Sequence, residues 1–115
     1  MIYRGSCHCG RVKFEAEGEL TAALSCNCSI CARKAALLWA IPRGAFRLLA
    51  VEGDLGRYTF NRHVLAHRFC KTCGIHTHGE DVAKGEGTSV YINLRCVDDL
   101  DLEALPVQHF DGRSV

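Results

Sequence analysis

The sequence predicts an all-β protein of coiled antiparallel sheets with one or two short helices. Its strongest periodic signal is the alternation of apolar and polar residues, which is typical of strands with one buried face. Glycine occurs 11 times in 115 residues, and it interrupts the chain at short intervals, as expected for turns between short strands. Helical periodicity is scarce. Together these observations favour an all-β fold.

Four segments are expected to form strands. Alternation is clear over residues 12–17, 58–61 and 90–94, so each of these segments should form a half-buried antiparallel strand. Residues 37–41 form a short continuous apolar run that Pro42 ends. Such a run predicts a more deeply buried strand.

Two short helices are expected beside the strands. Residues 29–36 can form two helical turns with Ser29 as the N-cap, because serine favours that position. Residues 99–105 can form a second helix with one apolar face, which Pro106 would end.

Length and composition predict one globular domain over residues 1–115. Chains of ~100–200 residues usually form one domain, and 48% apolar with 23% charged residues is typical of a folded protein. The formal net charge of +1 argues against nucleic-acid binding through bulk electrostatics and against a polybasic membrane anchor. The longest apolar run, residues 35–41, is too short to span a membrane. The N-terminus lacks the apolar segment of a signal peptide, so we expect a cytoplasmic protein with reduced thiols.

Two cysteine pairs, one before and one after the central cysteines, predict a structural zinc site. Each pair is followed directly by glycine, which permits the tight turn that lets two sulfurs reach one ion. Zinc takes four ligands, so the two pairs complete one closed site, formed by Cys7, Cys9, Cys70 and Cys73. This zinc would link positions 61 residues apart (9 to 70) and would stabilise the fold directly. Redox disulfides are the alternative.

Cys26, Cys28 and Cys31 form a second group of three thiols within six residues. A zinc ion held by three protein ligands keeps an open position for water or a substrate thiolate, as in catalytic zinc sites. Thiolate ligands favour zinc over magnesium or manganese. Two alternatives stay open: a closed structural site completed by Cys96 or a histidine, and redox thiols that pass through a disulfide.

The histidines carry weaker signals. His63 and His67 are expected at the surface or at a sheet edge. His8 should point away from the ligand pair that flanks it, because successive residues of an extended chain face opposite sides. His76 and His78 should share one strand face, where they could approach the second zinc but are expected to be solvated.

Two cations and two aromatic residues have alternative roles. Arg33 and Lys34 directly follow the three central cysteines, so they could hold an anionic substrate near the open zinc position. The alternative for both is a solvated helix end. Trp39 and Phe46 are expected in the core rather than in the walls of a substrate site.

Several short motifs occur in a fixed order along the chain. They are Gly5-Ser6-Cys7-His8-Cys9-Gly10, Cys26-Asn27-Cys28-Ser29-Ile30-Cys31, Tyr58-x-Phe60, Phe69-Cys70-Lys71-Thr72-Cys73-Gly74 and His109-Phe110-Asp111-Gly112. In this order and at these intervals they resemble the glutathione-dependent formaldehyde-activating enzyme family. The resemblance extends from about residue 5 to residue 112.

The resemblance implies a fold, a metal content and an activity. The fold would be a zinc-stapled β-tent of two or three antiparallel sheets. The family's two Zn²⁺ ligand sets match this sequence at Cys7, Cys9, Cys70 and Cys73 for the structural zinc and at Cys26, Cys28 and Cys31 for the catalytic zinc. The activity would be that of a carbon–sulfur lyase, which joins glutathione to formaldehyde or a related small aldehyde and yields S-hydroxymethylglutathione. A non-catalytic zinc scaffold or glutathione carrier is the alternative.

Overall fold

The computed structural model describes residues 1–60, 63–82 and 89–114. In these ranges the chain forms ten strands and one α-helix, which confirms the predicted all-β class. In chain order they are β1 (Ile2–Ser6), β2 (Lys13–Glu17), β3 (Ala23–Cys26), α1 (Ser29–Lys34), β4 (Leu38–Pro42), β5 (Phe46–Leu49), β6 (Leu55–Tyr58), β7 (Leu65–Cys70), β8 (His76–Asp81), β9 (Ser89–Asn93) and β10 (Val107–Phe110).

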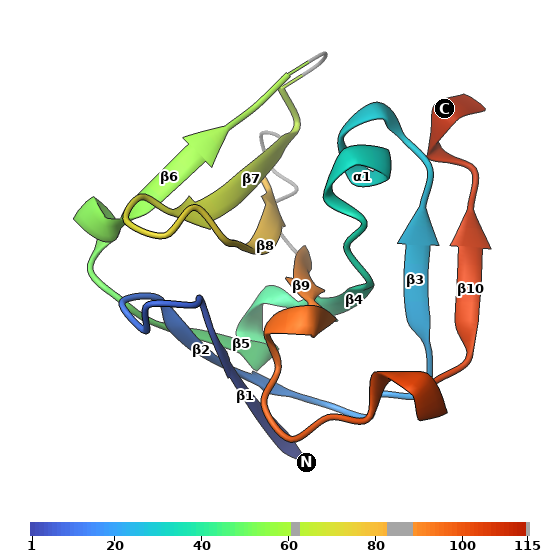
Figure 1. The fold of residues 1–115 in the computed structure, drawn as a ribbon, viewed down its shortest axis with the longest axis horizontal. Coiled ribbons are helices and arrows are strands. Elements are labelled where there is room, and N and C mark those ends of the chain that lie inside the picture. Colours follow the sequence, from blue (N-terminus) through green and yellow to red (C-terminus); the bar gives the residue numbers. More distant parts are fainter. Residues whose placement is uncertain (61–62, 83–88, 115) are drawn as a thin grey trace.

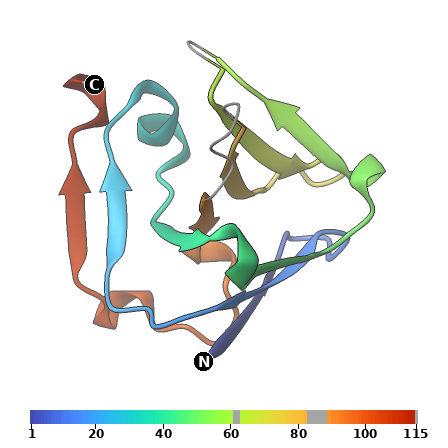
Figure 2. The ribbon, with the colours of Figure 1, turned by 180° about the vertical axis from the view of Figure 1, so that it is seen from behind.

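The strands form a small sheet and a large sheet. The small sheet has the order β1-β2-β5 and is antiparallel throughout. The large sheet has the order β10-β3-β4-β9-β8-β7-β6, and its pairs are antiparallel except for the parallel pair of β3 and β10. Figures 1 and 2 show β3 and β10 side by side at one end of the large sheet and β6 and β7 at the other. Between these two ends, from β10 to β6, the large sheet curves around the middle of the molecule.

The predicted strands are present with shifted ends. The 12–17, 37–41 and 90–94 segments overlap β2, β4 and β9. The 58–61 segment is placed differently, because β6 ends at Tyr58 and Phe60 lies beyond it. There the rings of Tyr58 and Phe60 stack 5.8 Å apart, and Phe60 also stacks on His67 at 5.6 Å. Ring stacking rather than strand pairing therefore accounts for this aromatic spacing, and residue 61 lies outside the described residues.

The predicted helices are shorter in the structure. The N-cap of α1 is Cys28 rather than Ser29, and the helix ends because Ala35 takes a left-handed conformation with φ 54°. In the 99–105 segment the structure has only one 3₁₀ turn, Leu102–Ala104. The side chain of Asp101, which precedes this turn, accepts a hydrogen bond from the backbone N–H of Glu103. None of the helices in the described ranges is long and apolar enough to cross a membrane.

The main core lies between the two sheets. It is formed by Phe14, Ala16, Ala23, Trp39, Ile41, Val90, Ile92, Leu94 and Val97. The core position predicted for Trp39 is thus observed. Phe46 is only half-buried, and it packs on this core through the ring of Phe14, with ring centroids 5.8 Å apart. The apolar face of β2 and the buried strands β4 and β9 therefore meet in one cluster.

Gly5 in β1 lies against the segment that follows β9. It forms an isolated antiparallel bridge with Val97, and it pairs with Phe14 across β1 and β2. A Cβ atom at this position would lie 2.6 Å from the carbonyl oxygen of Cys96 and against the Phe14 ring. The absence of a side chain is therefore a steric requirement of this contact.

Replacing Gly5 with alanine should lower the free energy of unfolding by ~1–3 kcal/mol, because the added methyl group overpacks the core against a backbone carbonyl. Gly44→Ala is the matched control, since a Cβ atom there would meet nothing within 4 Å. Urea denaturation monitored by tryptophan fluorescence measures both changes. Equal effects of the two substitutions would contradict the role assigned to Gly5.

Candidate metal centres and the adjoining pocket

The two outer cysteine pairs converge in the structure, as their spacing predicts. Cys7 directly follows β1 and Cys70 ends β7, while Cys9 and Cys73 lie in the adjacent turns. The four sulfur atoms all lie within 4.8 Å of one another. Sγ of Cys9 is 3.6 Å from Sγ of Cys7 and 3.6 Å from Sγ of Cys70. All eight cysteines of the chain are free of disulfide bonds.

The turns around this group bring backbone N–H groups close to sulfur. Gly10 and Gly74 have φ values of 86° and 81°, a conformation that glycine adopts without strain. The N–H of Val12 donates to Sγ of Cys7 at 3.4 Å, and the N–H of Thr72 donates to Sγ of Cys70 at 3.4 Å. Such donors stabilise the thiolate form, which is the form that binds a metal ion.

The three central cysteines form a second sulfur cluster. Cys26 ends β3, Cys28 caps α1, and Cys31 is buried within the first turns of that helix. The three sulfur atoms lie within 4.8 Å of one another, and no fourth cysteine, histidine or carboxylate from the described ranges joins them. Burial raises the pKa of the Cys31 thiol to about 12. Partial burial also opposes ionisation of Cys28, but hydrogen bonds from the backbone and thiol of Cys31, the thiol of Cys26 and the backbone of Ile30 outweigh it and lower the Cys28 pKa.

Cys96 does not complete this cluster. Its sulfur donates to the carbonyl oxygen of His76 at 3.5 Å and accepts from Nδ2 of Asn93 at 3.6 Å. Burial raises its pKa to about 11, and the nearby thiols that add to this shift are Cys7 and Cys73 of the outer group. Cys96 therefore lies on the side of the outer group as a neutral, half-buried thiol.

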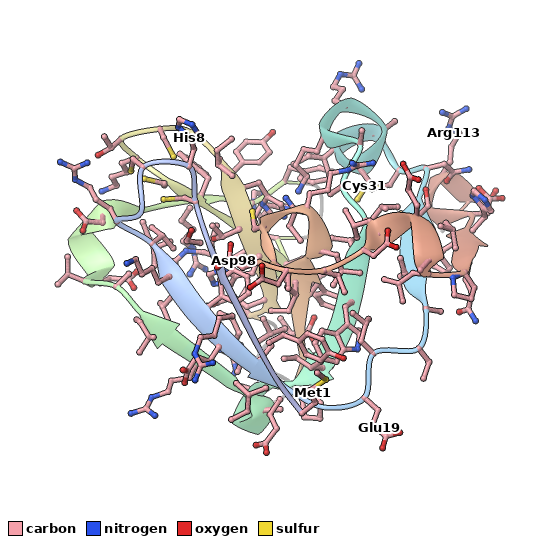
Figure 3. All side chains as sticks on the ribbon, turned by 60° about the horizontal axis from the view of Figure 1, so that its bottom comes forward. Met1, His8, Glu19, Cys31, Asp98 and Arg113 are labelled. Carbon is pink, nitrogen blue, oxygen red and sulfur yellow. The ribbon has the colours of Figure 1, made fainter. Side chains whose placement is uncertain are left out.

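The C-terminal segment holds the loop that carries the second cluster. The amide of Asn27, the residue between Cys26 and Cys28, donates to Oδ1 of Asp111 at 3.0 Å and accepts from the backbone N–H of Arg113 at 2.9 Å. A Cβ atom on Gly112 would lie 2.5 Å from Sγ of Cys26. Cys31 and Arg113 accordingly lie on the same side of the view in Figure 3, away from His8.

A pocket of about 380 Å³ opens beside the second cluster. Its walls are mostly apolar, and its polar atoms come from the cysteines and from a few basic and aromatic side chains. The described lining residues are Leu24, Cys26, Cys28, Ile30, Cys31, Lys34, Leu38, Phe60, Val64, Leu65, His67, His76, Gly79, Tyr91 and Phe110. The three sulfurs therefore face a hollow that can admit a small organic molecule.

Lys34 lies in this pocket between two imidazole rings. Its Nζ atom is 3.2 Å from Nδ1 of His67 and 3.2 Å from Nε2 of His76. Burial lowers the pKa of His67 to about 4 and that of His76 to about 3, and the Lys34 charge adds to both shifts. Both rings are therefore neutral near pH 7 and can accept a hydrogen bond from the Lys34 ammonium group.

The sequence prediction for His67 is wrong, and one of the two alternatives for Lys34 is excluded. His67 is buried rather than placed at the surface or a sheet edge, because β7 lies inside the large sheet between β6 and β8. Lys34 is half-buried rather than solvated. Its neighbour Arg33 is exposed and donates to the carbonyl oxygen of Ser29 at 2.8 Å. His63 is exposed, as expected.

A β-bulge separates His76 from His78. Across the β7–β8 pair, Arg68 lies opposite His78 and Phe69 opposite His76, so β8 contains one extra residue at this point. An extra residue moves the following side chains to the other face of the sheet. His76 therefore lines the pocket, whereas His78 is fully buried against the ring of Phe46, with ring centroids 4.7 Å apart. The prediction that both rings share a solvated face is wrong for this reason.

Comparison with known proteins agrees with this architecture. The family model of the glutathione-dependent formaldehyde-activating enzyme matches residues 2–110. The chain belongs to this family. A crystal structure of a Rhodobacter sphaeroides protein is similar to it, with a TM-score of 0.78 and 28% identity over 91% of this chain and 99% of that chain. Membership of the family supports an enzyme that acts on formaldehyde with glutathione.

Both sulfur clusters suit a zinc ion. Thiolate sulfur is a soft donor that selects zinc over magnesium, calcium or manganese. Four sulfurs can saturate tetrahedral zinc, whereas three leave one coordination position open. The outer group is thus a closed donor set, and the central group is an open one beside the pocket.

The contact of Gly112 with the central cluster can be tested by substitution. Gly112→Ala should displace the C-terminal segment from Cys26 and weaken metal binding at the three central sulfurs, while the outer group is unaffected. Titration with Co²⁺, followed through its sulfur charge-transfer absorption, should then give one tight equivalent instead of two. Gly53→Ala, whose Cβ atom would meet nothing within 4 Å, should bind Co²⁺ as the unmodified protein does. Two tight equivalents in Gly112→Ala would contradict this contact.

Proposed function

We propose that the protein is a zinc-dependent carbon–sulfur lyase that joins glutathione, or a similar thiol, to formaldehyde or a related small aldehyde. Cys26, Cys28 and Cys31 would hold the catalytic zinc. A structural zinc would be bound by Cys7, Cys9, Cys70 and Cys73, so that each chain binds two Zn²⁺. The observation that carries this proposal is a three-sulfur cluster without a fourth ligand among the described residues, which opens onto a pocket.

The proposed reaction adds a thiol across an aldehyde carbonyl group. The sulfur lone pair forms a new bond to the carbonyl carbon, the carbon–oxygen π bond breaks, and the thiol proton passes to the carbonyl oxygen. When bound, zinc would supply the positive charge that favours the thiolate form of a thiol at neutral pH. Because thiols and aldehydes react without a catalyst, the pocket needs to supply ionisation and proximity rather than a strong general base.

The residues around the central cluster are suited to this reaction. Cys28 is ionised more readily than an ordinary thiol, because hydrogen bonds from the start of α1 and from the thiols of Cys31 and Cys26 lower its pKa against the effect of partial burial. The apolar walls contributed by Leu24, Ile30 and Leu38 limit the access of water. Burial lowers the pKa of Lys34, and the nearby Cys31 and Cys28 oppose this shift, so its ammonium group is electrostatically coupled to the place where three ligated thiolates would leave a net negative charge. The site thus combines a sulfur donor set with a mostly apolar cavity.

Replacing Cys28 with serine should abolish catalysed adduct formation and leave the fold intact, because one of the three central ligands is lost while the outer group remains. NMR can measure the rate of S-hydroxymethylglutathione formation, and the rate without protein must be subtracted. Cys96→Ala is the control, since this thiol belongs to neither cluster, and it should keep activity. An unfolded Cys28→Ser protein would indicate a structural central site. A wild-type rate equal to the uncatalysed rate would indicate a carrier.

Zinc content gives an independent test of the two sites. We expect two zinc ions per chain by atomic spectroscopy, and mild chelation should remove the three-sulfur zinc first because its open position admits the chelator. Cys73→Ser should lose the outer zinc and with it much of the stability, since structural zinc contributes directly to folding. Reconstitution with Zn²⁺ controls for loss during purification. A soluble and fully active Cys73→Ser protein would contradict the assignment of the outer group.

A further inference from the structure

The pocket beside the central cluster differs in chemistry from a site for a strongly polar ligand. Its described walls are largely aliphatic and aromatic, with Leu24, Leu38, Leu65, Phe60 and Phe110 on several sides. Burying polar or charged groups against such walls costs free energy unless each group finds a partner. Most of the surface of a bound molecule should therefore be apolar.

Lys34 is the one side chain with a full positive charge among the described lining residues, and none of them is acidic. Two of the three N–H groups of its ammonium are directed to His67 and His76, at 3.2 Å each. The third has no acceptor in the described part of the chain. Because the two rings fix the position of Nζ, the remaining N–H is available to a ligand at a defined place in the pocket.

The β-bulge in β8 brings together the two histidines that hold the Lys34 ammonium group. It brings the His76 ring to the pocket face, where its centroid lies 6.1 Å from that of His67. On the other side, the ring of Phe60 stacks on His67 at 5.6 Å. The imidazoles that hold Lys34 are therefore themselves held by strand pairing and ring stacking, so the ammonium group is preorganised rather than mobile.

Glutathione does not match this distribution of charge. It carries two carboxylates and one ammonium group, together with two polar amide bonds. The described lining offers one ammonium group for an anion and no carboxylate for the ammonium group of glutathione. A ligand with a single anionic group and an apolar body would satisfy both the charge and the walls.

From this geometry we propose that the pocket takes a predominantly apolar molecule with one carboxylate or similar anionic group, which Lys34 binds through its free N–H. The inference rests on the proposed function, because this pocket would receive the thiol that adds to the aldehyde, and it narrows that thiol from glutathione or a similar thiol to one with an apolar body and a single anionic group. Lys34 then determines specificity, and His67 and His76 act as positioning residues. The interaction is a charge-assisted hydrogen bond in a mostly apolar cavity, which is stronger than the same bond in water.

Direct binding to the zinc-loaded full chain tests this without turnover. The probes are 4-phenylbutyrate, its neutral analogue 4-phenylbutanamide, and S-methylglutathione, whose thiol is blocked. Isothermal titration calorimetry should show that 4-phenylbutyrate binds about tenfold or more tightly than the amide, as expected for one charge-assisted hydrogen bond. It should also bind more tightly than S-methylglutathione.

Two substitutions on the same helix provide the matched comparison. Lys34→Met should make the affinities for 4-phenylbutyrate and the amide equal, with the affinity for the amide unchanged. Arg33→Met removes the same charge from an exposed position and should keep the tenfold preference. A preference that persists in Lys34→Met would place the carboxylate elsewhere, for example on the metal ion, and would overturn the proposal. If Lys34→Met reduced the affinities for 4-phenylbutyrate and for the amide by the same factor, the proposal would also be overturned, because Lys34 would then have only a structural role.

The remaining outcomes separate this inference from the proposed function. Tighter binding of S-methylglutathione than of 4-phenylbutyrate would overturn the inference while leaving glutathione-dependent catalysis intact. The expected binding pattern in a protein that accelerates aldehyde addition neither to glutathione nor to an apolar thiol with one carboxylate would support the inference and refute the proposed function.

Discussion

The close packing of reduced sulfur atoms is the constraint on which the rest of this structure depends. The outer cluster has four sulfurs and the central cluster has three, and within each cluster the sulfurs lie within 4.8 Å of one another. All of them belong to free cysteines. Thiolates at such distances repel one another, so they can ionise together only around a cation. The outer cluster connects the turn after β1 with the turn after β7, and the central cluster connects β3 with α1. Each cluster is therefore a point where the fold needs a positive charge.

The β7–β8 pair has a different polar network on each of its two faces. On one face, His67 and His76 hold Lys34 in the pocket. On the other face, Arg68 is nearly buried and pairs with the carboxylates of Glu52 and Glu80. There the fully buried ring of His78 lies 3.7 Å from Glu80 and lowers the pKa of that carboxyl group. Buried charges are tolerated only when they are paired, and the pairing of Arg68 with Glu80 joins β7 to β8 on this face.

Much of the fold and the grouping of the cysteines could be predicted from the sequence, because both depend on local spacing. Alternation over 12–17 and the glycines after each cysteine pair are signals that need no tertiary information. The position of His76 could not be predicted, because an extra residue in one strand reverses the faces that simple alternation assigns. Nor could the spacing distinguish Lys34 from Arg33, since a two-turn helix exposes or buries adjacent residues according to what packs against it. The approach of Gly112 to Cys26 depends on a parallel pairing of β3 with β10, for which the 109–112 motif was the only signal.

The two sulfur clusters use the same donor atoms in different surroundings, and this difference predicts different roles for them. The outer four come from turns fixed by β1, β2 and β7, with Cys7 and Cys70 buried in a second small core beside Val12 and Leu55. The central three lie at the end of β3, where one face is covered by the C-terminal segment and the other is open to the pocket. A saturated donor set inside a core can contribute only stability. An unsaturated set at the rim of a cavity has both an open coordination position and space beside it, so chemistry is expected there.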